Sequence, residues 1–193
     1  KLPKIVMPVH LGGQSCDMQK IYDLSIKYGF KIIEDASHAI GGKYNNEKIG
    51  NCKYSEVTVF SFHPVKIITS CEGGMAMTND IQIKQKLENF RTHGITRDQE
   101  MMTQDSHGSW YYEQIELGYN YRISDIHAAL GVSQLNRLDS YVNKRHKIAN
   151  RYNELLKGTQ IIHHQQQNAN TYTSYHLYII TVDCSAINIS HKE

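Results

Sequence analysis

The segment from Lys4 to Ala36 constrains the fold more than any other part of the sequence, because it has the pattern of strand, helix and strand in succession. An apolar run rich in β-formers, residues 4–11, is followed by the turn GGQS. Asp17 stands at the N-cap position of a helix that Gly29 ends, and FKIIEDA, residues 30–36, is a second strand. Two strands joined through a helix predict a parallel sheet with a crossover helix, and therefore an α/β layer fold.

The sequence after Ala36 predicts further strands and helices. The turn-rich GGKYNNEKIG predicts a hairpin or a loop. VTVFSF (57–62) and GGMAMTN (73–79) predict strands, and Asp80 is expected to cap a helix that runs to about Thr92. From Ser124 the pattern is helical as far as Leu156, and its apolar stripe is expected to face a core. The stripe consists of Ile126, Leu130, Val132, Leu135 and Leu138.

The C-terminal part predicts the start of a second, smaller domain. SYHLYIITV, residues 174–182, is expected to form a final strand, and the polar segment HHQQQNANT before it is a candidate boundary. We therefore expect residues 1–158 to form part of a large domain with its connecting helices, and residues 159–193 to begin a small domain. Both ends of the chain look cut, which predicts a fragment of a longer protein.

Composition excludes several classes of function. The formal net charge is only +2 over 193 residues, and basic and acidic residues alternate, so neither a nucleic-acid nor a membrane partner is expected. The four cysteines form no CxxC pair, which is typical of free thiols in the cytoplasm. His163 and His164 are adjacent in a polar stretch expected to be a loop, and no metal-binding spacing is present, so no metal site is predicted.

Candidate chemistry lies where two predicted strands end. In an open parallel sheet, ligands bind beyond the carboxyl ends of the strands. Asp35 ends one strand, and its carboxylate is either an ordinary capping or ion-pairing group or the partner of a cationic ring nitrogen. Lys66 follows the strand that contains Ser61 and precedes Glu72-Gly73-Gly74. A shielded lysine amine at such a strand end can form a Schiff base and move protons, whereas most lysines are solvated surface charges.

The order and spacing of these motifs resemble a known family. EDASHAIGG, SFHPVK followed by EGG, RTHG, and GYNYRISDIHAALGVSQL occur in the order expected of the DegT/StrS family of sugar aminotransferases, which depend on pyridoxal 5′-phosphate (PLP). The resemblance covers nearly the whole chain. PVHLGGQ and SFHPVK favour the subgroup that acts in pseudaminic acid biosynthesis. It implies the fold type I of PLP-dependent transferases, here incomplete, with a mostly parallel sheet.

The resemblance also implies roles for individual residues. Lys66 matches the lysine that binds PLP as an aldimine, and Asp35 matches the acid that pairs with the pyridine nitrogen. His38 matches the position, often Gln in the family, that lies near the phenolic oxygen of the cofactor. Ser61 matches a phosphate ligand, and Asn120 matches a residue that reaches the phosphate in the neighbouring subunit. A homodimer with shared active sites is therefore implied.

The chain departs from the family pattern in two respects. Cys71 precedes EGG where small residues are usual. The family's N-terminal segment, with its phosphate-binding loop and the aromatic residue that stacks on the ring, and most of its small domain lie outside this sequence. Family members that act as dehydratases have His in place of the lysine, so Lys66 favours transamination.

The expected reaction is amino transfer from L-glutamate to a nucleotide-linked keto-sugar, with a UDP-linked 4-keto-6-deoxy-N-acetylhexosamine as the favoured acceptor. Two alternatives remain open at this stage: a 3-keto-sugar aminotransferase of the same family, and a truncated fragment without catalytic activity. A nicotinamide-dependent oxidoreductase would need a GxGxxG sequence that opens a helix, and none is present.

Overall fold

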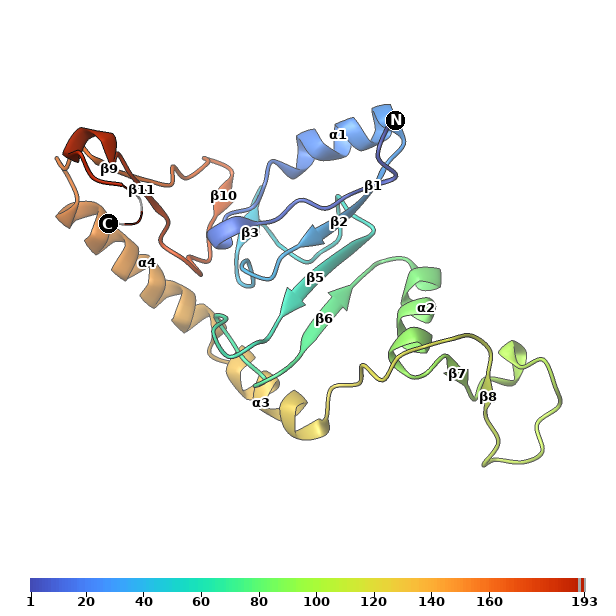
Figure 1. Cartoon of the computed structure of the whole chain (residues 1–193). Helices are drawn as coiled ribbons and strands as arrows, with labels where there is room; N and C mark the ends of the chain where they lie inside the picture. Colours follow the sequence, from blue (N-terminus) through green and yellow to red (C-terminus); the bar gives the residue numbers. More distant parts are fainter. Residues whose placement is uncertain (191, 193) are drawn as a thin grey trace.

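A four-stranded, mostly parallel sheet forms the centre of the computed structural model, which describes residues 1–190 and 192 (Figure 1). The strands lie in the order β1-β2-β5-β6, with β1, β2 and β5 parallel and β6 antiparallel to β5. Their bounds are β1 (Ile5–Val6), β2 (Lys31–Asp35), β5 (Val57–Ser61) and β6 (Gly74–Met77). The α/β fold with a mostly parallel sheet is confirmed, because β1 and β2 are joined through a helix.

That crossover helix is α1 (Met18–Tyr28). Gly29 ends it in the left-handed conformation, with φ of 72°, and its N–H donates to the carbonyl of Ser25, as predicted. Asp17 precedes the helix, but its side chain makes no capping hydrogen bond. Its carboxylate instead accepts a hydrogen bond from the hydroxyl of Tyr44 at 2.7 Å and pairs with Lys20 at 2.8 Å. The location of Asp17 therefore correctly predicted where α1 begins, but not the contacts that its side chain makes.

The predicted hairpin is formed by β3 (Lys43–Tyr44) and β4 (Glu47–Lys48). Asn45 and Asn46 connect them with positive φ angles of 49° and 65°, which a two-residue hairpin turn requires and which asparagine tolerates. A third strand, β10 (Thr171–Tyr172), pairs with β3. The hairpin thus ties the C-terminal part of the chain to the N-terminal part.

The core consists of three small clusters along β2, β5 and the loop that follows β5. One joins α1 and β2, one lies after β2, and one joins the segment after Lys66 to α4 (Leu138–Leu155). Their buried members are Met18, Ile32, Tyr44 and Tyr54 in the first, Ala36, Ala39 and Phe60 in the second, and Ile67, Ile68 and Val142 in the third. The clusters therefore fix the carboxyl ends of β2 and β5, where the candidate residues lie.

An arm extends from the body of the molecule after α2 (Ile81–Arg91) (Figure 1). As predicted, Asp80 caps α2, accepting hydrogen bonds from the N–H groups of Gln82 and Ile83 at 2.7 and 3.0 Å. The arm contains a short antiparallel pair and one helical turn. These are β7 (Ile95–Thr96), η2 (Gln99–Met101) and β8 (Glu113–Gln114).

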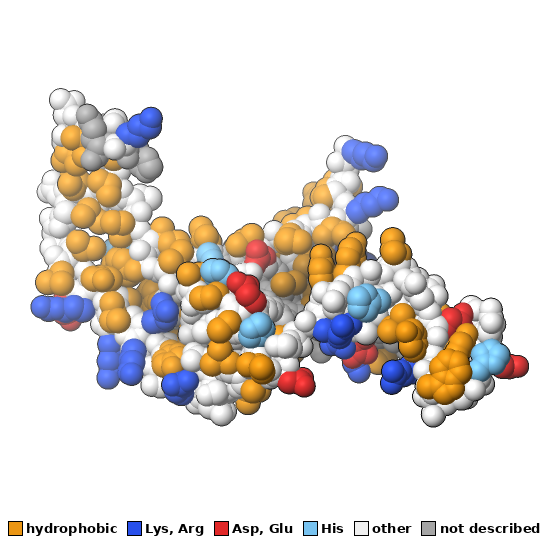
Figure 2. All heavy atoms as spheres, turned by 60° about the horizontal axis from the view of Figure 1, so that its bottom comes forward, with side chains coloured by type: hydrophobic (Ala, Val, Ile, Leu, Met, Phe, Trp, Pro, Cys, Tyr) orange, Lys and Arg blue, Asp and Glu red, His pale blue; other side chains and the backbone are white. Residues whose placement is uncertain are grey.

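The expected core stripe of α3 (Asp125–Leu135) is not buried. Ser124 does cap this helix, since its hydroxyl accepts a hydrogen bond from the N–H of His127. However, Ile126, Val132 and Leu135 are 82%, 62% and 50% exposed. Figure 2 shows hydrophobic side chains spread over the face that contains α3 and α4. The prediction of a core position was wrong for these three residues, because apolar spacing marks a surface that needs a cover, and no described part of this chain covers them. Leu138, at the end of the predicted stripe, does pack against the buried cluster of Ile67, Ile68 and Val142.

The predicted final strand is shorter than expected, and β11 comprises only Ile180–Val182. Residues 174–177 do not join it because two of their N–H groups donate to the carbonyls of Gly13 and Gly12. Strand β11 pairs with β9 (Ile162–His164), and η3 (Ser185–Ile187) follows it. His163 and His164 therefore lie in a strand rather than in the expected loop. None of the helices in residues 1–190 is long and apolar enough to cross a membrane.

Candidate active site

Asp35 and Lys66 are brought together by the parallel pairing of β2 and β5. Asp35 is the last residue of β2 and is the register partner of Val59 in β5. Ser61 ends β5, and Lys66 lies in the turn that follows, with its N–H donating to the carbonyl of His63 at 2.9 Å. Carboxyl ends of parallel strands share one edge of a sheet, so both side chains lie at the edge where ligands bind.

The carboxylate of Asp35 is held in its ionised form. Burial opposes ionisation, but it is outweighed chiefly by a hydrogen bond from the N–H of Ser37 at 3.0 Å. Electrostatic interactions with His38, in its protonated form, and with Lys66 add to this effect, so the pKa of Asp35 is lowered. The backbone is fixed as well, since the carbonyl of Asp35 accepts a hydrogen bond from the N–H of His10 at 3.0 Å. A negative charge is therefore present at the sheet edge that also carries Lys66.

The imidazole of His38 has a defined tautomer. Its Nδ1 accepts a hydrogen bond from the N–H of Gly12 at 3.3 Å, so Nδ1 carries no hydrogen and Nε2 is left as the donor. Burial, followed by the charge of Lys66, lowers the pKa of His38, while Asp35 opposes the shift. At neutral pH His38 thus presents an uncharged N–H donor.

In the Glu72-Gly73-Gly74 segment, the backbone conformation and the close packing at Gly73 require glycine. Gly73 has φ of 156°, and a methyl group there would come within 2.5 Å of the Ser70 hydroxyl and 2.9 Å of the Ile123 side chain. Gly74 is the register partner of Ser61. Cys71 is exposed and has φ of 65°, so its side chain lies outside the close packing that Gly73 makes.

Asn120 lies on another part of the molecule. It follows β8 on the way to α3, its backbone pairs with Thr92 after α2, and it is exposed. Four of the five predicted site residues, Asp35, His38, Ser61 and Lys66, therefore belong to the carboxyl edge of β2 and β5, and Asn120 does not.

Sequence reasoning missed three residues at or behind this edge. The ring of His176 contacts the ring of His38 in a tilted arrangement with centroids 4.4 Å apart, and Arg145 of α4 donates to the backbone carbonyl of His176 at 3.1 Å. His10 is fully buried, with Nε2 2.8 Å from the carboxylate of Glu34. The signal for Glu34 was present, because a carboxylate inside an apolar strand needs a partner. His176 and Arg145 gave no local signal, since only the fold brings residues so distant in sequence to His38.

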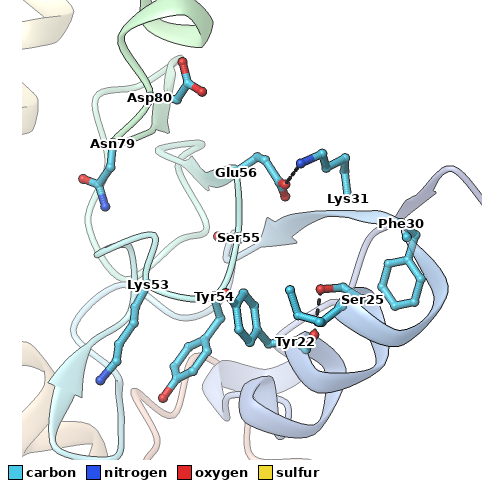
Figure 3. A pocket seen from close by; sticks show the side chains of 12 residues that line it. Tyr22, Ser25, Phe30, Lys31, Lys53, Tyr54, Ser55, Glu56, Asn79 and Asp80 are labelled. Atoms are coloured by element: carbon cyan, nitrogen blue, oxygen red, sulfur yellow. Dashed lines mark hydrogen bonds and ion pairs between the residues drawn. The ribbon is translucent and has the colours of Figure 1, made fainter.

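A pocket of about 650 Å³ opens at the opposite edge of the sheet (Figure 3). It is lined by residues at the amino ends of β2 and β5, among them Lys31 and Glu56, which form an ion pair at 2.9 Å. Tyr22 and Tyr54 also line it. Because this pocket lies at the amino ends of the strands, it is separate from the edge that carries Asp35 and Lys66.

The chemistry of the carboxyl edge suits one kind of ligand. An ionised carboxylate can hold a protonated aromatic nitrogen, an uncharged N–H can face an anionic ring oxygen, and a primary amine can condense with an aldehyde. Asp35, His38 and Lys66 supply these three groups from one sheet edge. The residues thus fit a PLP ring. Among the described residues, no group of three or more His, Cys, Asp or Glu side chains could hold a metal ion.

The sequence profile of the DegT/DnrJ/EryC1/StrS aminotransferase family matches residues 1–192. A UDP-4-amino-4,6-dideoxy-N-acetyl-beta-L-altrosamine transaminase of Campylobacter jejuni is 41% identical over 146 residues, which are 76% of this chain and 36% of that protein. The solved structure of Helicobacter pylori PseC, described as an aminotransferase involved in the biosynthesis of pseudoaminic acid, superposes with a TM-score of 0.84 at 30% identity. That match covers 94% of this chain and 46% of PseC.

A putative sugar aminotransferase of Streptococcus pneumoniae, Spr1654, has been solved in a PMP-form and a PLP-form. The PMP-form superposes with a TM-score of 0.81 at 29% identity, over 93% of this chain and 49% of that one. This chain spans about half or less of the length of the relatives it matches.

Proposed function

We propose that this chain, which belongs to the DegT/DnrJ/EryC1/StrS aminotransferase family, carries the lysine-bearing half of the active site of a PLP-dependent sugar aminotransferase. The observation that carries the proposal is the grouping of Asp35, His38 and Lys66 at the carboxyl edge of β2 and β5. PLP is the cofactor, and the structures of Spr1654 in PLP-form and PMP-form support this choice.

Each residue has a distinct task in the proposed site. When bound, PLP carries the amino group between two substrates and accepts electron density from the reacting carbon. Lys66 binds the cofactor through its amine and, once released, moves a proton to and from the substrate carbon. Asp35 keeps the ring nitrogen protonated, His38 donates its Nε2–H to the phenolic oxygen, and Ser61 binds the phosphate.

The proposed substrates are L-glutamate as amino donor and a nucleotide-linked keto-sugar as acceptor. We favour a UDP-linked 4-keto-6-deoxy-N-acetylhexosamine. Support comes from the Campylobacter jejuni relative, whose name gives a 4-amino-4,6-dideoxy-N-acetyl sugar linked to UDP. Amination at C4 of the keto-sugar would yield this class of product.

The proposed assembly is a homodimer with shared active sites, to which Asn120 contributes from the neighbouring subunit. Its separation from Lys66 within one chain supports this role. We propose residues 1–158 as part of the large PLP-binding domain with connecting helices and residues 159–193 as the start of the small domain. Four free cysteines favour the cytoplasm as its compartment.

A trapping experiment tests the proposal. The protein is incubated with PLP, reduced with borohydride and digested, and peptides carrying the cofactor are identified by mass spectrometry. We expect the label on Lys66 and its loss in Lys66→Ala, with Lys86→Ala as the control for an exposed lysine. Formation of 2-oxoglutarate from L-glutamate with the UDP-keto-sugar is measured in parallel. Labelling elsewhere, or no labelling, contradicts the assignment.

A further inference from the structure

The turn that carries His176 is locked against the loop that carries Gly12 and Gly13. The N–H of Ser174 donates to the carbonyl of Gly13 at 3.0 Å, and the N–H of Leu177 donates to the carbonyl of Gly12 at 3.2 Å. The Ser174 hydroxyl donates to the carbonyl of His38 at 2.9 Å. These bonds fix His176 relative to His38 and to the Asp35–Lys66 edge.

Arg145 fixes the same turn from the side of α4. One of its guanidinium nitrogens donates to the carbonyls of Tyr175 and His176, at 3.0 and 3.1 Å. Tyr175 has φ of 47°, so the backbone turns sharply just before His176. The orientation of the His176 imidazole is therefore set by backbone contacts on both sides.

The Nδ1 atom of this imidazole is buried and has no hydrogen-bond partner in the described part of the chain. A buried polar atom without a partner is unfavourable, and such atoms in folded proteins usually meet water, an ion or a ligand. Its surroundings are electropositive. Burial, then His38, Lys66 and Arg145, lower the pKa of His176 to about 4, so the ring is uncharged at neutral pH.

We propose that His176 is a ligand-contacting residue of the Lys66–Asp35 site. The Nδ1 atom of His176 forms a hydrogen bond with an anionic oxygen of the bound ligand. With its hydrogen on Nδ1, the uncharged ring can donate a hydrogen bond, and the positive charges of Lys66 and Arg145 attract an anionic acceptor to it. Carboxylate and phosphate oxygens share this chemistry. The inference rests on the proposed function and adds a contact for the amino-acid donor or for a phosphate-bearing ligand.

The test uses dicarboxylate and phosphate probes that cannot react with a cofactor. The 193-residue protein is labelled with ¹⁵N-histidine, and glutarate or inorganic phosphate is titrated in separate samples, each with and without PLP. We expect the Nδ1 resonance of His176 to shift and its pKa to rise with at least one probe. A response to glutarate assigns a carboxylate partner, a response to phosphate assigns a phosphate, and a response to neither overturns the inference.

Variants separate contact from folding. Asparagine places its amide near the position of Nδ1, whereas glutamine reaches the position of Nε2. We expect His176→Phe and His176→Gln to weaken binding of the effective probe about tenfold and His176→Asn to retain most of it. His146→Phe is the control, because the ring of His146 also contacts an aromatic ring, that of Tyr172 at 4.3 Å, but its Nε2 already contacts the carbonyl of Thr173 at 2.8 Å.

Equal binding by all His176 variants overturns the inference even if PLP labels Lys66. Absence of Lys66 labelling with an intact probe response instead overturns the proposed function alone.

Discussion

Asp35 and Lys66 lie at the carboxyl ends of neighbouring parallel strands, and the charge of the Lys66 side chain helps to lower the pKa of the Asp35 carboxyl. Within one chain, this relationship joins an ionised carboxylate and a primary amine across a ligand-binding edge. Burial raises the pKa of Asp35, so the hydrogen bond from Ser37 and the positive charge of Lys66 are what keep the carboxylate ionised at neutral pH.

Replacement of Asp35 by Asn should impair amino transfer while leaving the fold intact. The amide cannot hold a protonated ring nitrogen, and loss of one preorganised electrostatic contact typically lowers kcat about 100-fold or more. The measurement is kcat with saturating L-glutamate. Asp23→Asn, on the exposed side of α1, is the matched control. Unchanged kcat in Asp35→Asn would refute the role given to this carboxylate.

Mixing two inactive variants tests whether sites are shared. If Asn120 serves the neighbouring subunit, a heterodimer of Lys66→Ala and Asn120→Ala has one site with both defects and one intact site. A 1:1 mixture after subunit exchange should regain about a quarter of wild-type activity, because half of the dimers carry one working site of two. Lys66→Ala mixed with Asp35→Ala should regain none, since those residues serve the same site. No recovery in the first mixture would exclude sharing through Asn120.

Glu34 should make stability depend on acid pH. Burial raises its pKa, but hydrogen bonds from His10, Ser55 and Thr58 outweigh burial and lower it below 4.5 in the folded state. A lowered pKa contributes stability above the unfolded value, which is lost as pH falls through the folded value. Chemical denaturation at several pH values should therefore give a free energy of unfolding that decreases below about pH 4.5.

Variants of Glu34 identify the source of that dependence. Glu34→Ala leaves His10 buried without its partner and should lower the free energy of unfolding by about 3–5 kcal/mol. Glu34→Gln should flatten the acid dependence, while Glu88→Gln, on exposed α2, should not. An acid profile identical to wild type in Glu34→Gln would show that other groups cause it.

Gly13 should tolerate no side chain, in contrast to Gly29. A methyl group on Gly13 would lie 2.5 Å from the hydroxyl of Ser174 and 2.9 Å from the backbone nitrogen of Tyr175, at φ of 106°. Gly13→Ala should destabilise the protein by about 2–5 kcal/mol, from backbone strain and overpacking together. Gly29 also has a positive φ, 72°, but no atom would lie within 4 Å of an added methyl group. Gly29→Ala should therefore lower the free energy of unfolding by only about 1–2 kcal/mol. Thermal unfolding measures both, and equal losses would contradict the close contact with Ser174.

The sequence by itself determined the local elements and the position of the main candidate residues. Gly29 ends its helix because only glycine adopts the left-handed conformation there without strain, and Asp80 and Ser124 cap theirs through short side-chain oxygens. Asp35 could be selected because a carboxylate at the end of a buried strand is costly unless it is paired. Lys66 could be selected because it follows an apolar strand and precedes a pair of glycines, instead of lying on a helix face. These effects act over a few residues and can be recognised in a single sequence.

Tertiary structure alone decided which distant residues meet and which apolar faces are buried. His176 reaches His38 because residues 174–177 bond to the loop at Gly12 and Gly13 instead of extending β11. Ile126 and Val132 have the spacing of core residues, yet they are exposed, because burial depends on a partner surface that spacing does not specify. Local patterns fix backbone geometry and polarity, whereas long-range contacts depend on how the whole chain packs.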